Sequence, residues 1–137
     1  MILKEEQRIF GILEQFILKR QVNWKTTTLL EPNIDSNCRG VYIVRTKNKV
    51  MYVGKGSIRS RLNAHEQKLT GNLRGAKMTT KFSQLNEAKL VPPITSIYVV
   101  YFECNATERS ACEGFLINEF QPPLNDEVES NVLEELS

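Results

Sequence analysis

Hydrophobic residues recur along the chain at two different spacings, and these spacings predict its secondary structure. Residues 3–20 place apolar side chains at helical intervals with charges between them, which predicts an amphipathic N-terminal helix. Two apolar-rich runs, GVYIV and VMYVG, flank a polar turn at residues 46–49 and predict a β-hairpin. Residues 94–102 alternate and are rich in β-branched and aromatic side chains, so we expect a third strand there.

Helical patterns follow both the hairpin and the third strand. Ser57 is a candidate N-cap for a helix that runs to about Leu69, and residues 79–89 predict a second helix. After the third strand, Thr107 begins another helix, which ends at Pro122 because proline cannot continue it. These assignments place helices on both sides of the third strand in the chain.

The order of the elements indicates an α+β fold. Residues 22–39 contain several Pro, Asn, Asp and Ser residues and predict an irregular connection. The sequence therefore predicts a small antiparallel sheet of about three strands flanked by α-helices, with the N-terminal amphipathic helix as an addition.

Length and composition indicate one domain. A chain of 137 residues with 41% hydrophobic residues can form a single core. We expect residues 1–38 to pack on the same domain as residues 39–126, followed by an acidic tail at 127–137. No apolar run reaches the roughly 18 to 20 residues that cross a bilayer, and the N-terminus lacks a signal-peptide pattern. Three cysteines without a CxxC pair suit a reducing compartment, so we expect a cytoplasmic protein without a membrane partner.

Charge is distributed unevenly along the chain. The formal net charge is +2, yet residues 40–90 contain eleven basic and two acidic residues, whereas the segment from Asp126 contains five acidic residues and no basic one. A basic middle region is typical of proteins that bind polyanions, because lysine and arginine release counterions from phosphates. A solvated basic face explains the charge equally well.

Five short motifs occur in a fixed order. GVY lies in the first hairpin strand and YVG in the second, and they are followed by RLNAH, by ACEGFLINEF and by PPLN. Together these motifs resemble the GIY-YIG nuclease family over residues 39–126, most of the chain. Valine replaces the middle isoleucine of both tripeptides, on the opposite side of the strand from the tyrosines, so the change mainly affects packing. The resemblance implies a GIY-YIG catalytic domain that cleaves duplex DNA with a divalent cation.

Glu113 is the residue that we expect to hold the cation. Phosphodiester hydrolysis requires a deprotonated water and stabilisation of a pentavalent anion. One carboxylate can hold Mg²⁺, or Mn²⁺, when water and phosphate oxygens complete its coordination, and the cation then acts as a Lewis acid. The alternative is a solvated helix glutamate, a description that fits Glu119 better.

Arg61 and His65 are candidates for contact with the scissile phosphate. They are four residues apart on one predicted helix, so both project from the same face. The guanidinium of Arg61 suits phosphate oxygens and stays charged. A lone histidine is more often structural, but the match of RLNAH to the family favours a role for His65 in hydrogen bonding or proton transfer. Arg59 points away from Arg61 and is expected to position substrate.

The hairpin carries two tyrosines and a lysine with candidate roles. A free phenol has a pKa of about 10, so it becomes a base at neutral pH only where cations favour the phenolate. Lys55, Arg61 and the metal are candidates for that field, and the glycines around Lys55 allow close approach to a phosphate. The resemblance implies that Tyr42 contacts the nucleophilic water and that Tyr52 positions water or phosphate. Whether a tyrosine, histidine or lysine takes the proton stays open.

Other expectations concern the support of the site and its partners. Asn125 resembles a family residue that ties the segment after the Glu113 helix to the tyrosine strands, although a turn asparagine is the simpler explanation from spacing alone. A homodimer is expected through the Leu13 and Phe16 face of the first helix. We also expect contacts to DNA from three basic residues of the segment between residues 70 and 93, namely Arg74, Lys77 and Lys81. The alternative function is a nucleic-acid-binding module that keeps the fold without cleaving.

Overall fold

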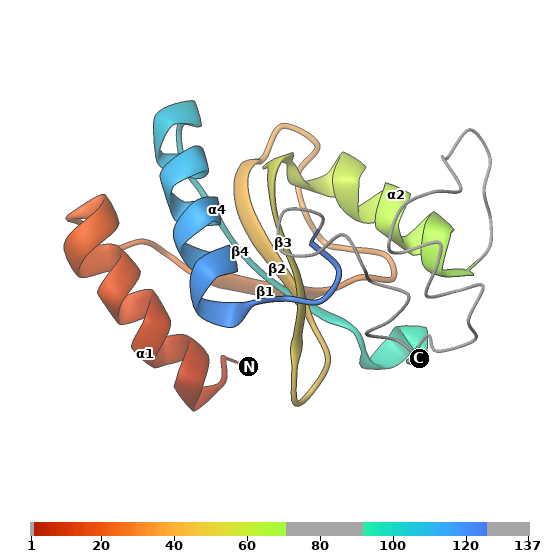
Figure 1. Ribbon diagram of the computed structural model, residues 1–137. Helices are drawn as coiled ribbons and strands as arrows, with labels where there is room; N and C mark the ends of the chain where they lie inside the picture. The colour runs from red at the N-terminus through yellow and green to blue at the C-terminus, as the bar shows by residue number, and fades with distance from the viewer. Residues whose placement is uncertain (1, 71–91, 126–137) are drawn as a thin grey trace.

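The computed structural model describes residues 2–70 and 92–125, which form a sheet with helices on both faces (Figure 1). In chain order the elements are the α-helix α1 (Lys4–Ile12), the π-helical turn η1 (Leu13–Leu18), the strands β1 (Lys25–Thr28), β2 (Arg39–Arg45) and β3 (Val50–Ser57), the α-helix α2 (Ile58–Thr70), the 3₁₀ turn η2 (Ile94–Ser96), the strand β4 (Tyr98–Glu103) and the α-helix α4 (Ala106–Phe120). Within these residues, no helix has the length and apolarity needed to cross a bilayer.

The sheet has four antiparallel strands in the order β1-β4-β2-β3. The expectation of about three strands was wrong because β1 lies in the segment predicted to be irregular. This strand is four residues long, reads KTTT and has mostly exposed side chains, so it lacks an apolar alternation. Its backbone nevertheless pairs with residues 98–101 of β4. Tertiary pairing therefore outweighs the weak local signal.

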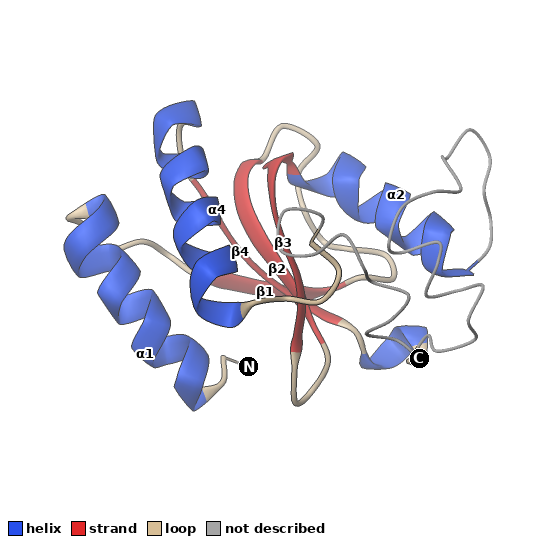
Figure 2. Cartoon of the chain, viewed as in Figure 1, coloured by secondary structure: helices blue, strands red, loops and turns tan. Residues whose placement is uncertain are grey.

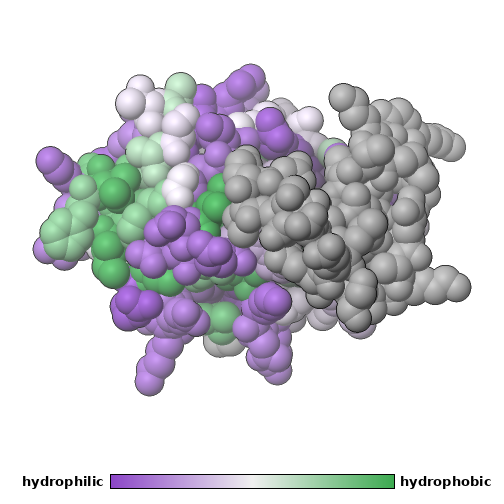
Figure 3. Space-filling model, viewed as in Figure 1, coloured by the Kyte–Doolittle hydropathy of each residue, from purple (hydrophilic) through white to green (hydrophobic). Residues whose placement is uncertain are grey.

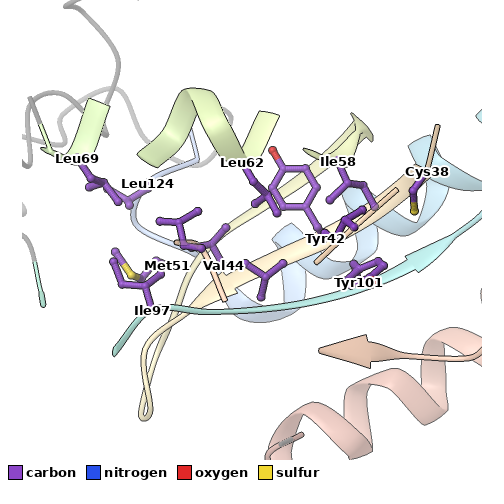
Figure 4. Close-up of a cluster of buried hydrophobic side chains, with 13 residues drawn as sticks. Cys38, Tyr42, Val44, Met51, Ile58, Leu62, Leu69, Ile97, Tyr101 and Leu124 are labelled. Carbon is purple, nitrogen blue, oxygen red and sulfur yellow. The ribbon is translucent and has the colours of Figure 1, made fainter. Parts of the chain in front are cut away.

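Helices cover the two faces of the sheet, and each face has its own core (Figure 2). α2 covers one face, where its apolar side chains meet those of β2 and of the segment after α4 (Figure 4). α1 and α4 cover the other face. The members of the second core are Ile9, Phe10, Leu13, Val41, Ile43, Val53, Val100, Phe102, Cys112 and Leu116.

The remaining predicted elements agree with the structure within a few residues. The hairpin turn at residues 46–49 is confirmed, and α2 begins at Ile58, directly after the predicted cap Ser57, and ends at Thr70, one residue later than expected. β4 is shorter than the predicted strand, because residues 94–96 form a 3₁₀ turn after Pro93. α4 begins at Ala106, since Asn105 caps it by accepting a hydrogen bond from the Glu108 N–H at 2.9 Å. The predicted helix at 79–89 and the acidic tail lie outside the described residues.

The N-terminal helix is confirmed, and it packs on the same sheet as the rest of the chain. Phe10 stacks on Trp24 at a centroid distance of 3.7 Å, and Trp24 meets Phe102 of β4 edge-on. Leu13 is fully buried in this core, so the expectation that it lies on a dimer face was wrong. Phe16 is 63% exposed. In Figure 3 hydrophobic side chains gather on the α1 side of the molecule.

A buried ion pair joins α1 to the end of the hairpin strand. Glu6 Oε2 lies 3.0 Å from Arg45 Nε, and both side chains are at most 3% exposed. The other carboxylate oxygen of Glu6 accepts a hydrogen bond from the Leu3 N–H at 2.9 Å, which closes the first turn of the helix. Arg45 therefore has an internal partner and is not part of an exposed basic surface.

Candidate active site

The two motif tyrosines lie on the same face of the sheet. β2 and β3 pair Tyr42 with Gly54 and Val44 with Tyr52, so the tyrosines are diagonal neighbours. Their ring centroids are 6.0 Å apart. The expectation that a tight hairpin brings both phenols to one region of one face, beside α2, is confirmed.

Gly54 leaves the space that the Tyr42 ring occupies. A Cβ atom built on Gly54 would overlap the outer end of the Tyr42 ring and its hydroxyl. The phenol therefore lies across the backbone of β3, which is the edge strand of the sheet. The last residue of YVG thus determines where the tyrosine of GVY points.

His65 holds the Tyr42 hydroxyl in place. It occupies the buried stripe of α2 with Ile58, Leu62 and Leu69, and only 7% of it is exposed. Its Nε2 is hydrogen-bonded to the Tyr42 hydroxyl at 2.8 Å, and its ring packs edge-on against Tyr52 at a centroid distance of 4.8 Å. Burial lowers the pKa of His65 to about 3, and the Lys68 and Arg61 charges act in the same direction. His65 is therefore a neutral imidazole at neutral pH.

Tyr42 is also a neutral group in the protein alone. Its side chain is fully buried, and this burial raises its pKa well above the ordinary value for a phenol. The Arg61 charge lowers the pKa, but burial outweighs it. The expected phenolate is thus disfavoured without a further cation. Tyr42 and neutral His65 can exchange donor and acceptor roles, because each carries one donor and one acceptor.

Arg61 is exposed near the start of α2 and lies against Gly56, near the end of β3. Its Nε would be 3.2 Å from a Cβ atom on Gly56, which has a φ of +114°. The positive φ favours glycine there, and the Arg61 side chain would have to move slightly to admit a larger residue. Arg61 and His65 are one helical turn apart, as predicted, yet only Arg61 reaches solvent. Arg59 is also exposed, and helical geometry directs it away from Arg61.

Glu113 approaches the same edge of the sheet from α4. Its carboxylate Oε1 lies 3.5 Å from Lys55 Nζ, and its side chain is 15% exposed. The Glu113 charge raises the pKa of Tyr42, after burial and Tyr52, so the carboxylate acts on the phenol. Lys55 also donates a hydrogen bond to Ser110 at 3.2 Å. In the free protein Lys55 thus neutralises the carboxylate instead of supporting a tyrosine phenolate.

Asn125 ties the chain after α4 to the edge strand. Its Oδ1 accepts a hydrogen bond from the Val53 N–H at 2.8 Å, and its Nδ2 donates to the Val53 carbonyl at 2.7 Å. The neighbouring Leu124 N–H donates to the Met51 carbonyl at 3.0 Å. The predicted tie to a tyrosine strand is therefore present, and it holds the residue next to Tyr52.

The residues around this edge can accept one hard cation through a single carboxylate. Among the described residues no group of three or more His, Cys, Asp or Glu side chains could form a complete protein-built metal site. Glu113 offers oxygen ligands, which Mg²⁺ and Mn²⁺ prefer, and water and phosphate oxygens can supply the others. The chemistry of this donor therefore fits a cation that binds together with substrate.

Sequence reasoning did not identify Ser110 as part of the site. Ser110 precedes Glu113 by three residues, so helical spacing alone predicts that the two side chains are neighbours. The sequence contains no signal that Lys55 would donate a hydrogen bond to Ser110. The predicted DNA contacts Arg74, Lys77 and Lys81 lie outside the described residues.

The motif elements found in the sequence converge on the edge formed by β3. Tyr42, Tyr52 and His65 are in mutual contact, Arg61 and Glu113 both influence the Tyr42 phenol, and Asn125 holds β3. Comparisons of the chain with protein-family models, curated proteins and solved structures gave no match. The likeness to GIY-YIG nucleases therefore stays an inference from the motif residues.

Replacing Gly54 by alanine is expected to displace the Tyr42 phenol. The added methyl group would occupy the space of the ring end, and overpacking of this kind costs about 1–3 kcal/mol. Urea denaturation should show this loss. Gly114→Ala is the matched control, because a Cβ atom at this helical position meets nothing within 4 Å and should leave stability unchanged or higher. Equal stability of Gly54→Ala and wild type would contradict the proposed steric role.

Proposed function

We propose that the protein is a divalent-cation-dependent DNA endonuclease of GIY-YIG type. The observation that carries the proposal is the hydrogen-bonded Tyr42–His65 pair, which lies at the sheet edge that Glu113 and Arg61 also influence. A buried polar pair in a core position contributes less to packing than an apolar pair would. In this proposal the hydrogen-bonded Tyr42–His65 pair is present because it orients the attacking water.

Each residue of the site has a role that follows from its geometry. Tyr42 is fully buried and held by neutral His65 in the protein alone, so in this proposal its phenol orients the attacking water once substrate and cation binding admit that water to the hydroxyl. Arg61 is exposed and permanently charged, so it binds a phosphate oxygen and stabilises the charge that develops there. Tyr52 contacts both His65 and Tyr42 and keeps them in position.

Glu113 supplies the cation ligand in this proposal. A bound Mg²⁺ or Mn²⁺ would polarise the scissile phosphate and lower the pKa of a bound water. The low pKa of His65, about 3, makes it a weak base. In this proposal the Tyr42–His65 pair orients the water and does not remove its proton. A stronger base than His65 takes that proton.

DNA is the substrate class that the charge pattern favours. Arg45 must be left out of the basic surface because it is buried against Glu6. The exposed or half-exposed basic residues of the hairpin and α2 are Arg39, Lys47, Lys49, Lys55, Arg59, Arg61 and Lys68. They lie on the two elements that carry the tyrosines, His65 and Arg61, so a phosphate backbone would be drawn to this part of the protein.

Tyr42→Phe is expected to slow plasmid nicking about 10- to 100-fold, because the water loses the hydroxyl that orients it. The measurement is conversion of supercoiled DNA to nicked and linear forms in Mg²⁺ and in Mn²⁺. Tyr52→Phe keeps the ring contacts and is expected to retain more activity, with DNA binding measured separately for both variants. Absence of nicking by the wild-type protein in either cation would overturn the proposed function.

The Lys55–Glu113 ion pair favours one alternative, a module that binds nucleic acid without cleaving it. A carboxylate that is permanently neutralised by lysine would hold no cation. This alternative predicts salt-sensitive binding to duplex DNA with no metal-dependent product. The same plasmid assay, combined with a binding titration, separates it from the endonuclease.

A further inference from the structure

Lys55 contacts α4 at two positions on one side of the helix. Along β3, Tyr52 and Gly54 face α2, whereas Val53 belongs to the core under α4, so strand alternation places Lys55 on the α4 side. There its Nζ lies 3.5 Å from Glu113 Oε1 and donates to Ser110 Oγ at 3.2 Å. Since Ser110 and Glu113 are three residues apart, one ammonium group bridges neighbouring helical positions.

The two partners of this ion pair differ in exposure. The Lys55 side chain is 41% exposed, whereas that of Glu113 is 15% exposed. A half-exposed lysine on a flexible four-carbon stem can leave a carboxylate at small cost, because exposed ion pairs contribute little free energy. The carboxylate, which is held on a helix and largely covered, stays in place.

We propose that Lys55 is a displaceable counter-ion, which neutralises Glu113 in the cation-free protein and moves to a substrate phosphate when a divalent cation binds the carboxylate. This proposal rests on the proposed function and adds how access of the cation to Glu113 is regulated. It explains why the lysine lies near the end of β3, between Tyr52 of the same strand and the helix of Arg61. The exchange keeps Glu113 compensated both with and without the cation, and it couples binding of the cation to binding of DNA.

Titration with Mn²⁺ alone tests the first half of the exchange. Binding is followed by the loss of the electron paramagnetic resonance signal of free Mn²⁺. Lys55→Met removes the competing charge, so its affinity for Mn²⁺ should exceed that of the wild type by about three- to tenfold. Lys25→Met is the matched control, because Lys25 is an exposed lysine of β1 at the opposite edge of the sheet, and its affinity should equal that of the wild type.

Duplex binding at several salt concentrations tests the second half. In EDTA, Lys55 is held by Glu113, so wild type and Lys55→Met should show the same salt dependence. With Ca²⁺ present, the slope of log affinity against log salt should be smaller by about one for Lys55→Met, because one phosphate contact is lost. Equal slopes in Ca²⁺ would overturn the transfer of Lys55 to phosphate.

Glu113→Gln separates failure of this proposal from failure of the proposed function. If the wild type binds Mn²⁺, Glu113→Gln does not, and Lys55→Met binds no more tightly than the wild type, the counter-ion role is overturned while the cation site stands. If Glu113→Gln binds Mn²⁺ as well as the wild type does, Glu113 is not the ligand and both proposals fail.

Discussion

Glu113→Gln is expected to abolish DNA nicking, with a rate loss of about 10³-fold or more, which corresponds to roughly 4 kcal/mol of transition-state stabilisation. Glutamine keeps the size of the side chain but removes the negative charge that would hold a divalent cation. Because glutamine fills the same space at this largely covered position and Ser110 remains as a partner of Lys55, the fold should be retained. The measurement is the initial rate of plasmid nicking at several Mg²⁺ concentrations.

Glu119→Gln is the matched control for this experiment. Glu119 lies on the same helix, two residues after Ile117, and its side chain is exposed. Its replacement removes the same charge from α4 and should leave nicking unchanged. Comparable nicking by wild type and Glu113→Gln, at matched stability, would contradict the assignment of Glu113 as the cation ligand.

Arg45→Leu is expected to destabilise the fold by about 3–5 kcal/mol, because it leaves the Glu6 carboxylate buried without its cationic partner. The double variant Glu6→Leu with Arg45→Leu should recover most of this loss, since an apolar pair avoids the desolvation of both charges. Urea denaturation at neutral pH measures both effects. Arg20→Leu is the control, because the Arg20–Glu108 pair is exposed and its loss should cost about 1 kcal/mol or less.

The pH dependence of the Arg45→Leu variant identifies the buried carboxylate as the cause. Burial raises the pKa of Glu6 above its ordinary value, while Arg45 lowers it. A raised pKa favours the protonated group in the folded state, so this contribution to stability is present at low pH and is lost as pH rises through the folded pKa. Without Arg45 the carboxyl protonates more readily, and the deficit of the variant should shrink as pH falls. A deficit that is the same at all pH values would point to lost packing.

The sequence predicted the elements with strong periodicity and missed the contacts between distant elements. The spacing of Ile58, Leu62 and Leu69 predicts α2 because one helix face has to be buried. β1 has no such signal, since its threonines are mostly exposed and the strand exists through its backbone pairing with β4.

Residue types and motif order also predicted most members of the candidate site, but not their charge states. The ten-residue separation of Tyr42 and Tyr52 does not by itself determine their face, because the register shift between Val44 and Arg45 brings both tyrosines to the same face of the sheet. Complete burial of Tyr42 depends on α2 and on the backbone of β3, so the neutral phenol could not be foreseen. The pairing of Lys55 with Glu113 joins residues far apart in the sequence, and local spacing carries no information about it.

The side chain of Asn125 has a consequence for self-association. An unpaired edge strand offers a row of N–H and C=O groups to a strand of another molecule, which is a common route to aggregation. On β3 the Asn125 amide already pairs with both backbone groups of Val53, and the Leu124 N–H pairs with Met51. The chain thereby blocks strand pairing at Met51 and Val53, beside the candidate site. The edge formed by β1, away from the tyrosines, has no such plug among the hydrogen bonds of the described residues.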